Sequence, residues 1–112
     1  MLNQVVLVGR LTKDVKTRKE EEKEFVIMTL AIPRSFKNSE GIYETDFISC
    51  YLYNNIATNT AEYCRKGDIV GVKGRLQTKT IETEEGNKEY QIYIVAEKVT
   101  FLSSRKENES ND

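Results

Sequence analysis

The sequence predicts a small all-β protein with one short helix, in which five strands close into a Greek-key barrel. Two observations carry this prediction. Strand-like runs, either β-branched or alternating between apolar and polar residues, recur along the chain, whereas one segment has helical spacing. Their order is three strands, one helix and two strands, which is the order of the OB-fold, with its helix between strands 3 and 4.

The first two strands are predicted from apolar runs on either side of a charged segment. Residues 4–11 are β-branched and apolar but too few for a helix, and Gly9 within them indicates the sharp bend that small barrels need. Residues 16–24 are charged and are expected to form a solvated turn or hairpin. Residues 25–32 form the second strand, whose core face is expected to carry Val26, Met28, Leu30 and Ile32. Pro33 has no N–H to donate and marks the end or the edge of this strand.

The third strand and the helix follow from two different periodicities. Residues 43–53 alternate with a period of two, so that apolar side chains face one way and mostly aromatic ones the other. The apolar set is Ile48, Cys50 and Leu52, and the outward set is Phe47, Ser49, Tyr51 and Tyr53. Residues 56–66 repeat small or apolar side chains at every fourth position, as a helix does, and Gly67 follows as a stop signal.

The last two strands are predicted on either side of a turn. Residues 68–81 form the fourth strand, residues 84–87 turn the chain through Gly86 and Asn87, and residues 89–102 return as the fifth strand. The OB-fold domain is therefore expected to cover residues 1–102. Residues 103–112 are polar and acidic, with no apolar side chain, and are expected to form a disordered tail.

The composition excludes several kinds of enzyme chemistry. The chain has no histidine, and its two cysteines, Cys50 and Cys64, do not form a CxxC pair, which excludes zinc sites and histidine-based catalysis. Both cysteines are expected to be free and buried in a reducing compartment. Glu44 and Asp46 are neighbouring carboxylates, but no convergent partner is visible for acid–base or metal chemistry. We therefore expect no catalytic residue, no metal and no cofactor.

The sequence indicates no membrane partner. The longest apolar run, residues 25–32, is too short to span a bilayer, and the N-terminus lacks the features of a signal peptide. A cytoplasmic location is therefore expected. The net charge of −1 argues against a polyanionic partner, but the acidic residues are gathered in a few blocks, which leaves room for a basic surface elsewhere.

Two stripes of side chains are predicted to point outward from the barrel. The aromatic stripe comprises Phe47, Tyr51 and Tyr53, with Phe36 before a loop, and the basic stripe comprises Lys73, Arg75 and Lys79. Flat rings stack bases and cations track phosphates, which is the combination that a single-stranded nucleic acid requires. The same pattern is also typical of an aromatic strand packed against another subunit and of a solvated basic strand, so a protein-interaction module is an alternative.

Several ordered motifs resemble those of the bacterial and phage single-stranded DNA-binding protein (SSB) family. They are NQVVLVGRLTKD at residues 3–14, TLAI at 29–32, FKN at 36–38, YETDFI at 43–48, Tyr63 with Lys66 and Gly67, and VKGRLQTK at 72–79. The resemblance extends over residues 1–102. It implies a nucleoid-associated, non-catalytic homotetramer or dimer that binds single-stranded DNA without sequence preference in replication, recombination or repair. Stacking and phosphate contacts do not read the 2′-OH, so a primosome-type or RNA single-strand binder is a second alternative.

The resemblance also assigns binding residues. The family's base-stacking rings fall on Phe36, Phe47 and Tyr53, and its basic contacts fall on Arg18, Lys66 and Lys79. Together with the two stripes and neighbouring cations, the predicted stacking residues are Phe36, Phe47, Tyr51 and Tyr53, and the predicted phosphate-binding residues are Arg10, Arg18, Arg34, Lys37, Lys66, Lys73, Arg75 and Lys79. Ile81 stands where the family usually has Trp or Tyr, and it can make an apolar contact but cannot stack a base.

The end of the chain departs from the family. Its members commonly finish in a Gly-rich linker and an acidic tip that recruits repair and replication proteins, whereas this chain ends in NESND at residues 108–112. We therefore expect tail-mediated recruitment to be missing, as in a trimmed chain or in a tail-less paralogue linked to DNA uptake or mobile elements.

Overall fold

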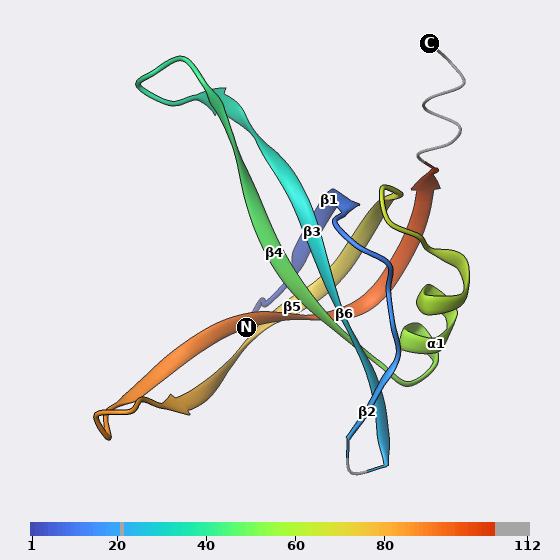
Figure 1. Ribbon diagram of the computed structural model, residues 1–112, viewed down its shortest axis with the longest axis vertical. Helices are drawn as coiled ribbons and strands as arrows, with labels where there is room; N and C mark the ends of the chain where they lie inside the picture. The colour runs from blue at the N-terminus through green and yellow to red at the C-terminus, as the bar shows by residue number, and fades with distance from the viewer. Residues whose placement is uncertain (21, 105–112) are drawn as a thin grey trace.

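The computed structural model describes residues 1–20 and 22–104, which form six strands and one helix (Figure 1). The strands are β1 (Val5–Leu11), β2 (Arg18–Glu20), β3 (Lys23–Lys37), β4 (Tyr43–Tyr53), β5 (Ile69–Glu82) and β6 (Lys88–Ser103), and the helix is α1 (Asn54–Tyr63). The β3–β4 and β5–β6 hairpins extend from the body of the molecule as two long arms (Figure 1). The tail predicted for residues 103–112 begins within β6, at Ser103, and residues 105–112 lie outside the described residues.

The strands close into the predicted OB-fold barrel. They form one sheet in the order β1-β5-β6-β4-β3-β2, and a further pairing between β1 and β3 closes five of them into a ring. β4 and β6 pair in parallel over a short stretch, with Cys50 opposite Ile94 and Tyr51 opposite Val95, whereas the other pairings are antiparallel. This short parallel contact brings the outward faces of β4 and β6 together.

The helix lies between the fourth and fifth strands of the structure, not between the third and fourth as predicted. The reason is β2, a short strand within the charged segment 16–24, which pairs with the start of β3 through Arg18 opposite Phe25. The segment was expected to be a turn or a hairpin, and it is a hairpin whose first strand stays outside the closed barrel. The five barrel strands and the helix otherwise follow the predicted order.

The core lies inside the barrel, on the strand faces that the alternation predicted. Val26, Met28, Leu30, Cys50 and Leu52 each expose 1% of their surface or less. α1 packs against β3, β4 and β6 and buries Ala57 and Thr60 there. Both cysteines are free and buried, and burial raises the pKa of the Cys50 thiol to about 11, so this thiol stays protonated and unreactive at neutral pH.

β3 continues past Pro33 instead of ending there. Pro33 pairs with Thr45 and Lys37 pairs with Tyr43, so the three residues 34–36 of β3 face a single residue of β4. The ladder is interrupted directly after Pro33, as its missing N–H leads one to expect, but the strand resumes after this bulge. The bulge lies in the β3–β4 arm, close to the loop at residues 38–42, and Phe36 belongs to it.

The helix ends at Tyr63, three residues before the predicted end. Cys64 has an extended backbone and a buried side chain, so this residue reaches the core from a position just outside the helix. The carboxylate of Asp68 then accepts the N–H of Arg65 at 2.7 Å, and that of Asp14 accepts the N–H of Lys66 at 2.8 Å. These carboxylates accept the two N–H groups that backbone carbonyls would accept in a further helical turn. Side-chain acceptors of this kind compete with continuation of the helix.

The described residues contain neither a membrane-spanning helix nor a cluster of metal-ligating side chains. No helix in residues 1–20 and 22–104 is long and apolar enough to cross a membrane. The same residues contain no group of three or more His, Cys, Asp or Glu side chains that could hold a metal ion.

Candidate nucleic-acid interface

β4 carries an aromatic surface on its outward face, as its alternation predicted. Phe47 and Tyr53 expose 68% and 36% of their surface, and Tyr51 between them is half-buried. Successive outward positions of a strand lie roughly 7 Å apart, about the spacing that bases stacked on neighbouring rings can follow. Phe25 of β3 lies opposite Tyr53, with ring centroids 6.4 Å apart, and so extends the surface across the sheet.

Tyr93 of β6 adds a ring that the sequence reasoning missed. It meets Tyr51 edge-on, with centroids 4.9 Å apart and an angle of 61° between the ring planes. Lys79 Nζ lies 5.2 Å from the Tyr51 ring centre and 5.6 Å from that of Tyr93, and it donates to the Tyr51 hydroxyl at 3.2 Å. The Gln77 amide donates to the Tyr93 hydroxyl at 3.0 Å. A hairpin that turns at residues 84–87, as predicted, pairs Gln77 with Tyr93. This pairing is the feature of the sequence from which the position of Tyr93 could have been predicted.

Three adjoining pockets run along this face, and we call them together the ring groove. The first is lined by Arg18, Lys23, Phe25, Ile27, Tyr51, Tyr53 and Lys79. The second shares Tyr51 and is lined on its other sides by Phe47, Ile48, Ser49, Leu76 and residues 91–94. The third shares Lys23 and Tyr53 with the first and reaches Arg75. The ring groove therefore places rings and cations side by side across β2, β3, β4, β5 and β6.

Three of the predicted cations line the ring groove. Arg18 and Lys79 line its first pocket together with Lys23, a cation of the charged segment 16–24 that was predicted to form a solvated turn or hairpin and not to bind a ligand. Arg75 lines the third pocket, where its guanidinium lies 3.3 Å from the Glu97 carboxylate. Of these cations, Lys79 has the closest contacts with the rings.

Three other predicted cations lie outside the ring groove. The Arg10 guanidinium, near the C-terminal end of β1, donates to the carbonyl of Gly67 at 2.7 Å. Lys66 lies in the turn that follows α1. Lys73 is exposed on β5, in register with Val6 of β1. The structure does not bring these three side chains together with the rings.

The two arms carry the remaining predicted contacts. Phe36 exposes 64% of its surface on the bulge of β3, and the Nζ of Lys37 lies 5.6 Å from the centre of the Tyr43 ring. Ile81 is 40% exposed near the end of β5. None of these three side chains is among the lining of the ring groove in the described residues, so the strand of a ligand would have to reach the arms to contact them.

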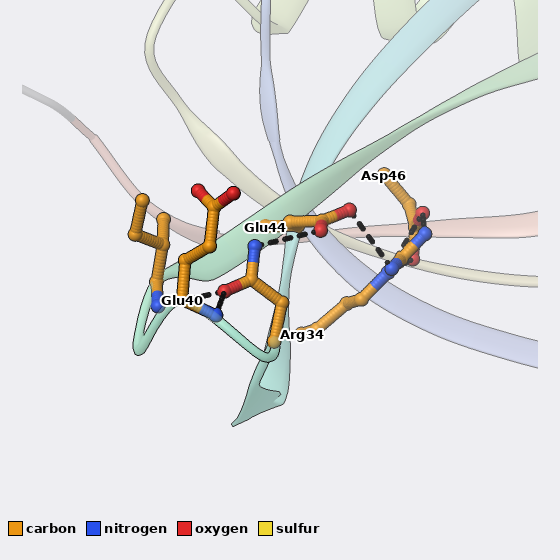
Figure 2. A network of polar contacts seen from close by, with 6 residues as sticks. Arg34, Glu40, Glu44 and Asp46 are labelled. Carbon is orange, nitrogen blue, oxygen red and sulfur yellow. Dashed lines mark hydrogen bonds and ion pairs between the residues drawn. The ribbon is translucent and has the colours of Figure 1, made fainter.

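Arg34 is held by two carboxylates in the β3–β4 arm, close to its loop (Figure 2). Its guanidinium lies 3.0 Å from Glu44 and 2.9 Å from Asp46, and the hydrogen bond and charge of Arg34 hold the pKa of the Asp46 carboxyl below its usual value. Glu44 also accepts a hydrogen bond from the Asn38 amide at 2.9 Å, while the Asn38 side-chain oxygen accepts the N–H of Glu40 at 2.9 Å. The carboxylates therefore fix the arm, and they offset the positive charge that Arg34 would offer to a phosphate.

The barrel and its ring groove define an OB-fold module of the class that accommodates single-stranded nucleic acids. The chain belongs to the Single-strand binding protein family, whose sequence model matches residues 2–102. It is 45% identical over 113 residues to "Single-stranded DNA-binding protein B" of Bacillus subtilis (strain 168), with 100% of both chains covered.

Two longer relatives show the same similarity. The chain is 46% identical to "Single-stranded DNA-binding protein 3" of Listeria innocua and 44% identical to "Single-stranded DNA-binding protein" of Bacillus cereus. Both alignments cover 94% of this chain but 66% and 62% of those relatives, so the chain spans slightly less than two thirds of their length.

Proposed function

We propose that the chain binds single-stranded DNA without sequence preference, stacking bases on the rings of the ring groove and pairing phosphates with its cations. The observation that carries this proposal is the presence of both kinds of side chain on one face, with Tyr51 and Tyr53 beside Lys79 and Arg18. The family and the names of the relatives, each a single-stranded DNA-binding protein, support DNA as the ligand.

The two kinds of contact explain affinity without sequence preference. Every base has a π-face, so a ring accepts any base, and each stacked base contributes ~1–3 kcal/mol as judged by removal of its ring. Phosphate contacts displace counterions from the strand, which makes binding weaker as the salt concentration rises. Neither contact distinguishes one base from another, so the groove favours coating a strand over recognising a site.

An oligomer, either a homotetramer or a dimer, would extend the path of the strand. One OB domain covers ~4–16 nucleotides, and several linked faces bind more tightly through their effective concentration. Val6 and Val8 on the outward side of β1 expose 69% and 54% of their surface, and exposed apolar neighbours of this kind support a contact between subunits. A strand wrapped around such an assembly would pass the outlying cations Arg10, Lys66 and Lys73.

The proposed role is to coat and protect single-stranded DNA during replication, recombination or repair, in the cytoplasm and in association with the nucleoid. No catalytic step is part of this proposal. The engagement of Glu44 and Asp46 with Arg34 supports a structural role for these carboxylates in place of acid–base work.

The experiment that tests the proposal is a titration of the intrinsic tyrosine fluorescence with oligo-dT and with oligo-rU at two salt concentrations. We expect saturable quenching by oligo-dT that weakens at the higher salt concentration. Tighter binding of oligo-rU than of oligo-dT would favour the RNA or primosome-type alternative. Absence of saturable quenching with either strand would contradict the proposal and favour the protein-interaction module.

A further inference from the structure

We propose that Tyr93 contacts DNA directly and that, together with Tyr51 and Lys79, it forms one distinct nucleotide site within the ring groove. We call these three residues the tyrosine–lysine site. The inference rests on the proposed function and assigns a binding role to a residue outside the predicted set. It also assigns Tyr51, which was predicted to stack a base, and Lys79, which was predicted to contact a phosphate, to a single site.

The two rings are held in place before a ligand arrives. Tyr51 and Tyr93 are both half-buried and meet edge-on, so neither ring covers the other face to face. Their hydroxyls are fixed by hydrogen bonds from Lys79 and Gln77. Both rings line the second pocket of the ring groove together with Phe47, which leaves ring surface facing a space that a base can enter. Little conformational freedom remains to be lost on binding, and preorganisation of this kind favours affinity.

Lys79 supplies the charge that a nucleotide needs next to a ring. Its Nζ lies 5.2 Å and 5.6 Å from the two ring centres, and none of the ion pairs among the side chains of residues 1–19 and 22–104 involves it. A nucleotide presents a base and a phosphate separated by one sugar. An ammonium group directly beside two rings can therefore meet the phosphate while a ring meets the base.

Tyr93 is the aromatic residue that the β5–β6 arm places on the face of Lys79. The register pairs Gln77 with Tyr93, Lys79 with Gln91, and Ile81 with Glu89, and paired residues of an antiparallel ladder share a face. The arm therefore has a single ring on this face within these pairs, and Ile81, toward the tip, cannot stack a base. The ring site of the arm lies beside the barrel, four residues or roughly 13 Å from the position of Ile81.

The test compares Tyr93→Ala with Tyr90→Ala, Tyr93→Phe and the wild type in binding of fluorescein-labelled oligo-dT by anisotropy. Tyr90 is the matched control because it lies on the same strand, exposes 77% of its surface and points to the opposite face of the arm. We expect Tyr93→Ala to weaken binding roughly 5- to 150-fold, as loss of one stacked base does, and Tyr93→Phe to bind within about twofold of the wild type. Tyr90→Ala should bind as the wild type does, and thermal unfolding should give similar Tm values for all three variants.

A second measurement uses the wild-type chain and so does not depend on the folding of a variant. Oligo-dT that carries 5-iodo-2′-deoxyuridine is crosslinked by ultraviolet light, and the modified peptides are mapped by mass spectrometry. We expect a crosslink at Tyr93 or Tyr51 in addition to those at Phe47 and Tyr53.

Three outcomes would overturn the inference. If Tyr93→Ala binds like the wild type and the crosslinks spare residues 51 and 93, the tyrosine–lysine site is wrong while the proposed function stands. If Tyr90→Ala loses as much affinity as Tyr93→Ala, the loss is not specific to this face and the site is wrong as well. If the wild-type chain fails to bind oligo-dT at all, the proposed function fails and takes this inference with it.

Discussion

Replacing Lys79 by Met tests whether the cation beside the rings contacts a phosphate. The substitution removes the charge and keeps an unbranched side chain of similar length. The Nζ of Lys79 makes no ion pair among the described residues, in contrast to Arg34, which is held by Glu44 and Asp46. The charge of Lys79 is therefore free to displace a counterion from the DNA, and its loss should appear in the salt dependence of binding.

The expected size of the effect follows from counterion release. Each phosphate neutralised on a single strand contributes ~0.7 to the slope of log K against log salt concentration. Between roughly 50 mM and roughly 200 mM salt, a slope difference of ~0.7 corresponds to about a 2.6-fold change in the affinity ratio of wild type to variant. The wild type should therefore have its largest advantage at the lowest salt concentration.

The assay is anisotropy of labelled oligo-dT at four or more salt concentrations, with Lys79→Arg and Lys98→Met measured beside Lys79→Met. Lys79→Arg keeps the charge and should keep the slope. Lys98 is exposed on β6 opposite Lys73, away from the ring groove, and Lys98→Met should also keep the slope. An unchanged slope in Lys79→Met, whatever its affinity, would refute the assignment of Lys79 as a phosphate contact.

Three further predictions concern the scaffold. Gly74→Ala should lower the free energy of unfolding by about 1–3 kcal/mol, measured by chemical denaturation, because an added Cβ would meet the backbone carbonyl of Val95 in the adjacent strand. Asp46→Asn should be less stable than the wild type at pH 6, and this difference should begin to shrink as the pH falls below about 4 and vanish only below the lowered pKa of the folded-state carboxyl. The reason is that Arg34 lowers the pKa of the folded-state carboxyl, so the stabilisation is present above the unfolded-state pKa and is lost as the carboxyl is protonated; Tm values measured from pH 2 to pH 6 check it. The thiol of Cys50, whose pKa burial raises to about 11, should resist iodoacetamide at pH 8 in the folded chain and react after denaturation, as mass spectrometry will show.

Alternation along single strands was enough to predict most of the fold and part of the ring groove. A side chain in a strand faces one way or the other, so the burial of Cys50 and Leu52 and the exposure of Phe47 and Tyr53 follow from their parity alone. The order of the elements gave the barrel in the same way, because few topologies accommodate three strands, one helix and two strands.

Contacts between strands were harder to predict, since they depend on register and on how the barrel closes. Tyr93 meets Tyr51 because β4 and β6 pair in parallel over a short stretch, and no local pattern indicates that pairing. Lys23 belongs to a charged segment, and the hairpin of this segment places it in the lining of the same pocket as Tyr53. Arg34 was predicted to bind a phosphate, and its ion pairs with Glu44 and Asp46 join it to the neighbouring strand β4 beside the bulge in β3.

The helix end shows a different limit of the sequence pattern. The four-residue spacing from Ile56 to Cys64 indicates which side chains reach the core. It does not indicate whether the backbone at each of these positions is helical. Cys64 follows the last helical residue and has an extended backbone, yet its side chain is buried. The Asp68 carboxylate then accepts the N–H of Arg65. Tertiary contacts of this kind override local propensity at element boundaries.

Base stacking in the ring groove is tested by the affinity of the double variant Phe47→Ala with Tyr53→Ala for labelled oligo-dT, measured against the wild type and against Tyr63→Ala. Tyr63, at the end of α1, exposes 70% of its surface and lies outside the ring groove, so its loss controls for removal of an exposed ring. If bases stack on these rings, the double variant should bind at least about 30-fold more weakly, as loss of two stacked bases requires, and Tyr63→Ala should bind like the wild type. A double variant that folds normally and binds within a small factor of the wild type would contradict base stacking in the ring groove.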